Sequence, residues 1–499
     1  MFNKIIKTNE ELEKLRIKFK NKKIGLCHGV FDIVHLGHIK HFEQAKKKVD
    51  ILLVSVTADK FVKKGFSQPY NNENKRVLFL SSINFIDYVF LNDFPTADSV
   101  IKLLKPNFYF KGKDYLQGDF TNNLEKEKKI LRKQNGVIKF TTSEIMSSTK
   151  IINNFFLDWN KKQKEYLLNA SKKYNFEQLL KIFENIKEKE INIMGEIILD
   201  EYVYTNFVGV TSKDPAMSLI KKDSETIPGG ALAVAMILSK FSKRVNFYTC
   251  GKTEIFKTFL KDYKNIYIFN LDDKKNIQIK TRFINFNRFE KILQITNFKN
   301  NPSNEKIFKN LNKYKNNLKD HIMICDYGID MFDFKVINLL ENLKIKRFLN
   351  VQTNSLNYGF NLFTKYKKFN YLCLDEREWK LGIKQEELNS NLILKFVSKI
   401  SKNKKYILAH TMGKNGSKIY LNNKNYYAPV FLNQTKDTTG CGDAYYAITS
   451  LLILNNVKDL NLVVFLGNLY AGIHGQYFGN KHITNRVDFL KYTKSILNF

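Results

Sequence analysis

The sequence predicts an α/β protein with two domains in tandem, joined by a helical connector. Its 499 residues exceed the length of one typical domain, and a hydrophobic content of 43% is enough for sizeable cores. At residues 24–38 and again at 191–202, an apolar run that predicts a buried strand ends in a polar turn. Residues 156–190 are charged and carry few turn signals, which favours helix. We therefore expect domains at residues 1–155 and 191–499.

The first domain has two histidines at a predicted helix start. The helix is expected to follow the apolar run and to open at His35. A helix N-terminus offers free N–H groups and the positive end of a dipole, both of which attract phosphate. His35 and His38 are spaced i, i+3, so they lie on one helix face and can reach the same phosphates. Either imidazole can supply charge or a hydrogen bond to a leaving pyrophosphate.

The residues around these histidines carry a family resemblance. Positions 29–38 read G-V-F-D-I-V-H-L-G-H, which resembles the G-x-F-D-x-x-H-x-G-H signature of the cytidylyltransferase-like nucleotidyltransferases. The resemblance implies a Rossmann-like fold and transfer of a nucleotide to a phosphorylated small molecule, with release of pyrophosphate. It places Gly29, Phe31 and Asp32 in the nucleotide site.

The second half of that signature is a hydroxyl-rich helix start. Positions 144–151 read E-I-M-S-S-T-K-I, and Ser147, Ser148 and Thr149 are suited to binding a triphosphate. A plain helix cap explains the same residue types, but the pairing with the histidine motif favours the nucleotide site.

A third stretch in this domain narrows the resemblance. Positions 111–115 read K-G-K-D-Y and resemble the K-G-x-D-Y of the adenylyltransferase half of bacterial ADP-heptose synthases. By that resemblance Lys111 contacts phosphate, Asp114 shapes the substrate pocket, and Arg76 lies near the nucleotide. The resemblance covers roughly residues 22 to 155.

The second domain begins with features of a ligand site. Asp200 follows the apolar run that starts at Ile191, where a strand would deliver a carboxylate to a ligand. Gly229 and Gly230 precede an alanine-rich segment, and two glycines before a helix let the backbone approach a ligand closely.

Residues 436–445 carry the decisive motif of the second domain. They read K-D-T-T-G-C-G-D-A-Y and resemble the D-T-x-G-A-G-D signature of ribokinase-like (PfkB-type) sugar kinases. Gly440, Cys441 and Gly442 can present N–H groups as an anion hole for the transferring phosphoryl group. Asp443 can accept the proton of the attacking sugar hydroxyl. Cys441 stands where the family usually has alanine.

Weaker motifs follow the order expected for such a kinase. Positions 411–416 resemble a T-x-G-x-x-G nucleotide loop, and positions 375–378 resemble an N-x-x-E stretch that organises magnesium through water. Two stretches resemble heptose kinases in particular: positions 325–327 resemble their S-D-Y, and positions 280–282 resemble their K-x-R. The residues implied are Thr411, Gly413 and Gly416 for nucleotide, Asp375 and Glu378 for metal, and Asp326 and Arg282 for substrate. Asp375 replaces the family's asparagine. Arg282 can clamp a sugar phosphate bidentately.

One segment departs from the family. Where heptose kinases have a D-P-K-type segment, residues 350–355 read N-V-Q-T-N-S. The lost aspartate and lysine predict a change in how sugar and phosphates are held. We expect the substrate to be a related but distinct sugar, and the product to be a precursor of a cell-surface polysaccharide.

Composition indicates which kinds of partner and which cellular compartment to expect. The net charge of +34 comes mostly from lysines spread along the chain, so we expect no nucleic-acid partner. The chain has five scattered cysteines and neither an 18-residue apolar run nor a secretory h-region near its start. We therefore expect a reducing cytoplasm and no membrane insertion.

Together these motifs predict a bifunctional enzyme that resembles ADP-heptose synthases with the domain order reversed. Its expected ligands are Mg²⁺, ATP or CTP, and a small sugar phosphate, and a homodimer is compatible with the sequence. Two alternatives stay open. One is a CTP-dependent cytidylyltransferase for a polyol phosphate or another sugar, fused to a carbohydrate kinase. The other is a non-catalytic sugar-nucleotide sensor that has kept the fold.

Overall fold

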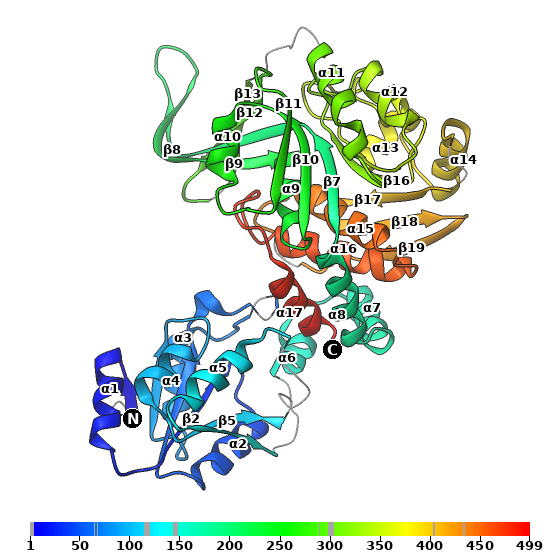
Figure 1. Cartoon of the computed structure of the whole chain (residues 1–499). Coiled ribbons are helices and arrows are strands. Elements are labelled where there is room, and N and C mark those ends of the chain that lie inside the picture. Colours follow the sequence, from blue (N-terminus) through cyan, green and yellow to red (C-terminus); the bar gives the residue numbers. More distant parts are fainter. Residues whose placement is uncertain are drawn as a thin grey trace. The chain divides into compact units, whose positions relative to one another are not determined.

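The chain folds into two compact units. The structure, a computed structural model, describes residues 4–63, 65–66, 68–113, 120–142, 148–288, 290–297, 304–402, 405–432 and 435–499. The first unit comprises Met1–Trp159, Leu167–Lys173 and Leu490–Phe499, and the second comprises Asn160–Tyr166 and Tyr174–Phe489 (Figure 1). Each unit is described separately below, and the domain boundaries expected from the sequence stay a prediction.

A six-stranded, wholly parallel sheet forms the centre of the first unit. Its order is β1 (Ile5–Ile6), β4 (Tyr88–Asn92), β3 (Ile51–Thr57), β2 (Ile24–Gly29), β5 (Phe108–Gly112) and β6 (Val137–Thr141). The strand order changes direction between β2 and β5. In open parallel sheets, ligands bind at the carboxyl ends of the strands beside such a switch point.

Helices cover both faces of this sheet. Leu26 and Tyr109 pack with α1 (Asn9–Lys18), α4 (Asp98–Leu104) and α5 (Asn123–Arg132). Cys27 and Phe110, the next residues along the same strands, pack with α2 (Leu36–Lys46) and α3 (Glu73–Ser81). Because successive side chains of a strand point to opposite faces, a sheet buried on both sides needs continuous apolar strands. The apolar run at 24–31 meets this need.

Residues from three separate parts of the chain complete the first unit. Beyond α6 (Ser148–Ile151) and a π-helical turn (Ile152–Phe156), the side-chain amide of Asn153 donates to the Ser495 carbonyl at 2.8 Å. The rings of Phe66 and Tyr492 meet edge to face with centroids 5.7 Å apart. Ser495 and Tyr492 belong to α17 (Arg486–Ile496), so the end of this helix is part of the core of the first unit.

The second unit is built on a nine-stranded sheet. Its seven parallel strands are β11 (Ile266–Asp272), β10 (Arg244–Cys250), β7 (Glu190–Gly195), β14 (His321–Asp326), β15 (Lys346–Val351), β16 (Tyr371–Asp375) and β17 (Ile407–Thr411). The antiparallel strands β18 (Ser417–Leu421) and β19 (Lys424–Ala428) complete one edge.

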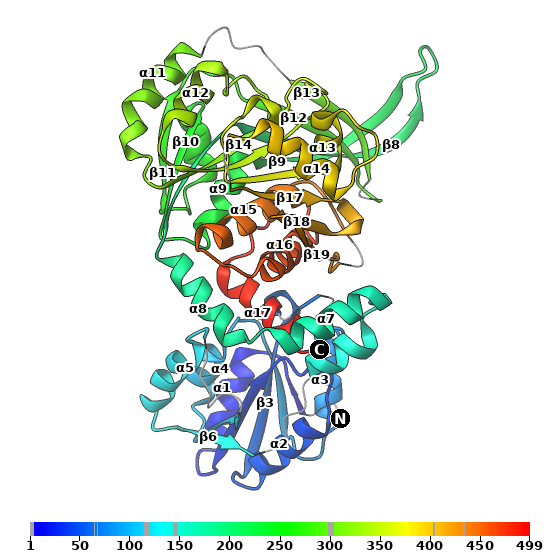
Figure 2. The ribbon, with the colours of Figure 1, turned by 90° about the vertical axis from the view of Figure 1, so that its right-hand side faces the viewer.

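Two layers of helices enclose this sheet (Figures 1 and 2). One layer contains α11 (Glu305–Tyr314), α12 (Phe334–Asn342), α13 (Glu376–Ile383) and α14 (Ser390–Ile400), whose apolar residues share a core with Ile324, Leu349 and Leu372. The other contains α9 (Ala231–Ser239), α15 (Cys441–Leu454) and α16 (Leu460–His474). The hydroxyl of Tyr446 in α15 donates to the Phe348 carbonyl at 2.8 Å, which fixes α15 against β15.

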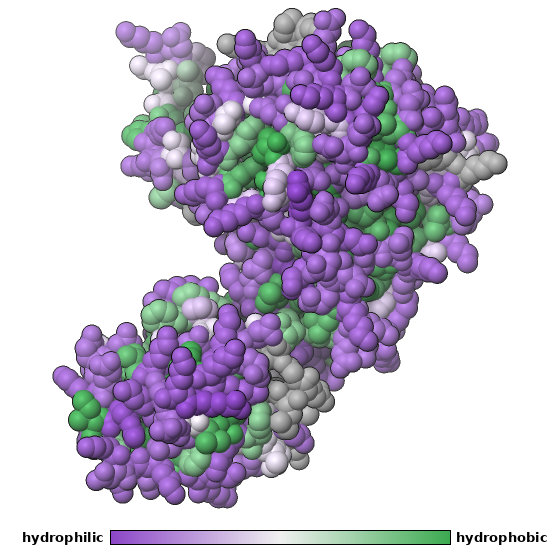
Figure 3. Space-filling model, viewed as in Figure 1, coloured by the Kyte–Doolittle hydropathy of each residue, from purple (hydrophilic) through white to green (hydrophobic). Residues whose placement is uncertain are grey.

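A second, smaller sheet belongs to the same unit. Its order is β13 (Lys291–Asn297), β12 (Gln278–Asn285), β8 (Ile197–Val210) and β9 (Met217–Gly230). The ends of β8 and β9 project as a hairpin arm (Figure 1). The surface of the unit is mostly hydrophilic, with apolar atoms on this arm (Figure 3). The exposed apolar residues of the arm are Phe207, Val208, Val210, Met217 and Ile220.

Two expectations about composition can be compared with this structure. All five cysteines are described, and none of them forms a disulfide. Within the described part of the chain, the helices are too short or too polar to cross a membrane.

Candidate functional site

The candidate site of the first unit begins where β2 ends at the switch point. Phe31, two residues after this strand, has a left-handed backbone with φ of 51°, and its ring folds back over Gly29. A Cβ at position 29 would come within 3.0 Å of that ring, so glycine suits this close approach. The turn delivers the chain to His35, the N-cap of α2.

His35 and His38 lie together at the start of α2. Their rings stack with centroids 3.9 Å apart, and the rings of Phe31 and His38 meet edge to face with centroids 5.4 Å apart. The backbone N–H of His35 donates to Nδ1 of His38 at 3.4 Å. Partial burial lowers the pKa of His35, because desolvation disfavours the charged imidazolium. At neutral pH His35 is therefore a neutral hydrogen-bonding group at the positive end of a helix.

Lys111 lies at the carboxyl end of β5, the other strand of the switch point. Its ammonium is buried 3.5 Å from the Glu127 carboxylate and 4.8 Å from the centre of the Tyr109 ring. Tyr109 also donates to Glu127, at 3.1 Å. A phosphate bound by Lys111 would therefore compete with Glu127 for the ammonium.

Asp32 and Arg76 were both expected to contact the nucleotide, but they hold the surrounding loops. The carboxylate of Asp32 accepts the N–H groups of Tyr70 and Asn71, each at 2.8 Å. The guanidinium of Arg76 has no exposed surface. It donates to the Val30 carbonyl at 2.6 Å, and to the Thr57 carbonyl and Asp59 carboxylate at 2.8 and 2.5 Å. Because these donors are enclosed by protein, Arg76 fixes the ends of β2 and β3 rather than facing a ligand.

The two halves of the nucleotidyltransferase signature meet in space. At the start of α6, the hydroxyl of Ser148 donates to the Ile33 carbonyl at 3.0 Å. This bond places Ser148 and the half-buried Thr149 beside the turn that leads to the histidines. Ser147 and Asp114 lie outside the described residues.

Two further histidines lie near this edge and were not singled out from the sequence. At the end of β2, Nδ1 of His28 is 3.1 Å from the Ser55 hydroxyl. In α2, Nδ1 of His41 is 2.6 Å from the Thr141 hydroxyl, and burial lowers the pKa of His41 to about 4. The one available signal was a polar residue, His28, at the carboxyl end of an otherwise apolar strand.

The candidate site of the second unit is centred on the start of α15. Gly440, the N-cap, has φ of 82°, and a Cβ there would come within 2.5 Å of Asn480 Oδ1 and 2.9 Å of His474 Nε2. Only glycine fits such a position. The N–H of Cys441 already donates to the Thr438 carbonyl at 3.1 Å. The predicted anion hole therefore has Gly440 and Gly442 as its available amides, since no described residue accepts from either.

Asp443 lies in the first turn of α15 and is buried. One carboxylate oxygen, Oδ1, accepts the Tyr327 hydroxyl at 2.9 Å and the side-chain amides of Asn350 and Gln352 at 3.1 and 2.6 Å. Burial raises the pKa of Asp443 to about 6, against the opposing effect of these hydrogen bonds. A carboxylate with this pKa is ionised at neutral pH and can accept a proton.

Three charged residues of the small sheet form a cluster, and one of them, Lys280, lies near Asp443. Lys280 and Arg282 lie on β12 beside Asp200 on β8, and the Arg282 guanidinium donates to the Asp200 carboxylate. Burial lowers the pKa of Lys280, against the attraction of Asp200 and Asp443. Arg282, predicted to clamp a sugar phosphate, is therefore paired already, whereas Lys280 is a second cation that was not assigned from the sequence.

The glycine pair before α9 serves this cluster. A Cβ at Gly229 would come within 2.7 Å of Asp200 Oδ2, and Gly230 has φ of 59° at the helix N-cap. These glycines let β9 pass close to the Asp200 carboxylate.

Asp437 belongs to the motif at residues 436–445, although no role was predicted for it. It links the small sheet to the loop before α15. Its carboxylate accepts from Lys291 of β13 at 2.7 Å and from the Tyr202 hydroxyl of β8 at 3.0 Å. Burial opposes its ionisation, but hydrogen bonds from Lys291 and Thr439 outweigh burial and hold its pKa at about 2. Asp437 is therefore an ionised anchor.

Asp326 was expected to contact the substrate, and the structure gives it a structural role instead. It is fully buried at the end of β14. Its carboxylate accepts from the Lys365 ammonium at 2.6 Å, the Tyr366 hydroxyl at 2.7 Å and the Asn361 amide at 3.1 Å. The following residue, Tyr327, is the one that faces Asp443.

The predicted nucleotide loop and metal residues lie on adjacent strands. Asp375 ends β16 and pairs in register with Thr411, the last residue of β17. Gly413 and Gly416 follow with φ of 52° and 84°, as the tight loop after β17 requires.

Asp375 and Glu378 form a reciprocal capping box at the start of α13. Each carboxylate accepts the backbone N–H of the other residue at 2.7 Å. Among the described residues, no group of three His, Cys, Asp or Glu is placed to hold a metal ion. The pair does not fit a resident magnesium site, although a cation bound mainly by nucleotide phosphates and water needs no such group.

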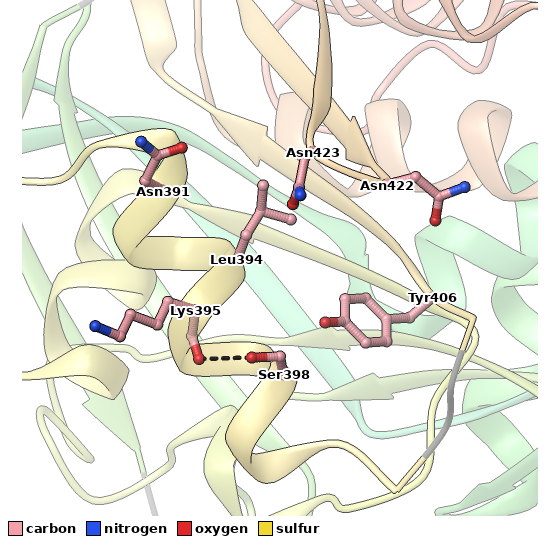
Figure 4. Close-up of a pocket in the computed structure, with 7 residues that line it drawn as sticks. All are labelled: Asn391, Leu394, Lys395, Ser398, Tyr406, Asn422 and Asn423. Atoms are coloured by element: carbon pink, nitrogen blue, oxygen red, sulfur yellow. Dashed lines mark hydrogen bonds between the residues drawn. The ribbon is translucent and has the colours of Figure 1, made fainter.

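A pocket of the second unit lies away from this chemistry. It is a hollow of about 530 Å³ lined by residues of α14, by Tyr406 and by the β18–β19 turn (Figure 4). Tyr406 precedes β17, so the pocket is at the amino end of that strand, whereas Thr411 is at the carboxyl end. None of the residues predicted for a site lines it.

Comparison with known proteins assigns the first unit. Residues 26–154 match the model of the family described as cytidylyltransferase-like. These residues form a cytidylyltransferase-like domain. The chain is also 40% identical over 148 residues to the bifunctional protein HldE of Aliarcobacter butzleri, and 46% identical over 116 residues to that of Campylobacter jejuni subsp. doylei. The two matches cover 29% and 23% of this chain, and it spans only 31% and 25% of those relatives' own length.

Structural comparison assigns the fold of the second unit. The crystal structure of phosphofructokinase-2 from Escherichia coli in complex with substrates and products is similar with a TM-score of 0.50 at 15% sequence identity. The similarity covers 61% of this chain and 99% of the kinase. At this identity the comparison shows the fold alone, and it confirms the α/β fold expected from the sequence for this part of the chain.

Proposed function

We propose that the chain is a bifunctional enzyme that makes a sugar nucleotide. The second unit phosphorylates a sugar or sugar phosphate with ATP, and the cytidylyltransferase-like domain transfers a nucleotidyl group from a nucleoside triphosphate to a sugar 1-phosphate. The observation that carries the proposal is Asp443, an ionised, buried carboxylate in the first turn of α15. No described residue accepts from the amides of Gly440 and Gly442 at the start of this helix. A proton acceptor beside an anion-binding helix start is what phosphoryl transfer to a hydroxyl needs.

In the kinase reaction, Asp443 takes the proton from the attacking sugar hydroxyl. The sugar oxygen forms a bond to the γ-phosphorus of ATP as the bond from that phosphorus to the β-phosphate bridge oxygen breaks and ADP leaves. The amides of Gly440 and Gly442 stabilise the charge on the transferring group. Lys280 lies where it can attract an anionic substrate toward Asp443. Magnesium arrives with ATP as part of the substrate.

In the nucleotidyl transfer, an oxygen of the sugar 1-phosphate attacks the α-phosphorus of the nucleotide. The bond from that phosphorus to the β-phosphate bridge oxygen breaks, and pyrophosphate leaves. His35 and His38, at the N-terminus of α2, donate hydrogen bonds to the growing negative charge. Ser148 lies close enough to the same turn to contact the triphosphate.

The substrate that we favour is a heptose phosphate, with ADP-heptose as product. Its support is the likeness of part of this chain to bifunctional proteins named HldE, together with the presence of both folds in one chain. We place the enzyme in the cytoplasm, where nucleoside triphosphates are available, and the free cysteines agree with that compartment. A homodimer stays a prediction.

A product assay by mass spectrometry tests the proposal. The full chain is incubated with magnesium, ATP or CTP, and a panel that includes heptose 7-phosphate and heptose 1-phosphate. We expect a bisphosphate from the former and ADP-heptose from the latter. Turnover of another sugar, or transfer only from CTP, would keep the two reactions and replace the substrate. If neither unit converts any member of the panel, the sensor alternative gains the stronger support.

A further inference from the structure

The segment at residues 350–361 is rich in side-chain amides where the resemblance led us to expect an aspartate and a lysine. The amides recur on the end of β15 and in the loop that follows it, and they are Asn350, Gln352, Asn354, Asn357 and Asn361. Each of the five donates a hydrogen bond within the described structure. Their targets fall into two layers.

The first layer acts on Asp443 directly. Asn350, which is buried, and Gln352 both donate to Oδ1 of Asp443, at 3.1 and 2.6 Å. The Tyr327 hydroxyl supplies a third donor to the same oxygen at 2.9 Å. All the hydrogen bonds that described residues make to this carboxylate therefore end on one oxygen, and Oδ2 stays available.

The second layer holds Tyr327. The amides of Asn354 and Asn357 both donate to the Tyr327 backbone carbonyl at 2.8 Å. A Cβ at Gly328 would come within 2.2 Å of the Asn357 amide nitrogen, so backbone and amide are in close contact there. Asn361 donates to the Asp326 carboxylate at 3.1 Å and to the Gln352 carbonyl at 3.0 Å, which joins the two layers.

We propose that this amide segment positions the base of the kinase reaction, fixing Oδ1 of Asp443 so that Oδ2 faces the substrate hydroxyl. The inference rests on the proposed kinase function. Neutral donors suit this task because they orient the carboxylate without adding a positive charge that would weaken it as a base. Gln352 and Asn350 are thus positioning residues in place of the charged pair expected there.

Substitution of Gln352 by methionine tests the first layer, since methionine keeps the approximate length and removes the donor. Loss of a hydrogen bond to the charged form raises the pKa of a carboxyl group. We expect the pKa of Asp443 to rise by about one pH unit. The measurement is a ¹³C NMR titration of aspartate-labelled full chain, with the Asp443 signal identified by its loss in Asp443→Asn. In the kinase assay, the acidic limb of kcat should move by the same amount while KM for ATP stays unchanged.

Three further variants serve as a second test, a control and a test of the second layer. Tyr327→Phe removes one donor to the same oxygen and should move the titration in the same direction, which covers the case in which Gln352→Met does not fold. Gln385→Met is the matched control, because Gln385 is exposed just beyond the end of α13, and it should change neither readout. Asn357→Ala should lower kcat less than Gln352→Met, since it acts through Tyr327.

The titration and the assay separate two kinds of failure. An unchanged Asp443 titration in both Gln352→Met and Tyr327→Phe would overturn the positioning role. If the variants shift the Asp443 titration but the wild-type chain phosphorylates no sugar, the positioning role would be supported and the proposed kinase function overturned.

Discussion

The two candidate sites use the same architectural device for opposite proton chemistry. In each unit a helix begins at the carboxyl edge of a parallel sheet, with His35 before α2 and Asp443 in the first turn of α15. Burial disfavours the charged form of both side chains, so it lowers the pKa of His35 and raises that of Asp443. The same physical cause keeps an imidazole neutral as a hydrogen-bond donor and makes a carboxylate a better proton acceptor. The side chain at the helix start, rather than the fold, therefore decides which reaction each site can support.

Substitution of Asp443 by asparagine should produce the largest effect and should separate the two sites most clearly. Asparagine cannot accept the proton of a substrate hydroxyl, so kcat for sugar phosphorylation should fall by about 10³- to 10⁴-fold. Nucleotidyl transfer, measured in the same preparation by pyrophosphate release, should stay within about twofold of wild type. A comparable loss of both activities in a folded protein would show that the sites are not independent.

His38→Ala should have the reverse effect and a smaller size. Removing one of two stacked imidazoles takes away a donor to the leaving pyrophosphate, so nucleotidyl transfer should slow by about 10²- to 10³-fold. Sugar phosphorylation is the internal control and should not change. An unaltered rate of pyrophosphate release would remove His38 from the catalytic machinery.

The pH dependence of the two activities should differ in the acidic range. Asp443 must be ionised to act, so the kinase rate should fall about tenfold for each pH unit below its pKa of about 6. The lowered pKa of His35 means that it stays neutral to a lower pH than an ordinary histidine, so any acidic decline of nucleotidyl transfer should be displaced toward lower pH. Initial rates of both reactions in one buffer series measure the contrast, and coincident acidic limbs would contradict it.

Arg76→Met sharpens the comparison at the level of stability, with little change expected in the chemistry of either site. It leaves the Val30 and Thr57 carbonyls and the Asp59 carboxylate without their buried donor, at a cost of about 2 to 4 kcal/mol in the free energy of unfolding. Thermal unfolding followed by circular dichroism should show a lower midpoint for the first unit. Arg132→Met, at an exposed position on α5, is the matched control. Equal midpoints for the two variants would assign Arg76 no structural role.

Much of the fold followed from the sequence because its signals are local. An apolar strand and a turn before His35, and a glycine-rich turn before Asp443, each predicted a helix start. The structure has both helices at those positions. Such signals depend on neighbours within one or two turns of the chain, which a sequence displays directly.

The less predictable part concerns the direction of side chains and their distant partners. Arg282 matched a substrate-binding pattern, but its guanidinium meets Asp200, which lies 82 positions earlier. Asp326 matched another, and its carboxylate turns inward to Lys365 and Tyr366. A motif states which residue types occur at a position, whereas the direction of each side chain depends on strand pairing and packing that the motif does not encode.

The amide segment, residues 350–361, also shows that side-chain contacts cannot be predicted from a sequence motif. In the sequence, residues 350–355 lack the aspartate and the lysine of the D-P-K-type segment that heptose kinases have there. In the structure, Asn350 and Gln352 instead supply two of the three hydrogen bonds to Asp443. A departure from a family pattern is visible in a sequence, but the compensating contact is visible only in three dimensions.

The packing of α17 has a consequence for how the chain is made. Tyr492 and Ser495, near the end of this helix, contact Phe66 and Asn153 in the core of the first unit. During synthesis a domain generally folds once its residues have left the ribosome, yet these partners are translated only after the whole second unit. We therefore expect the first unit to stay incompletely packed until the second unit has been synthesised. A released chain that ends at residue 489 should hold a folded second unit and a protease-sensitive first unit.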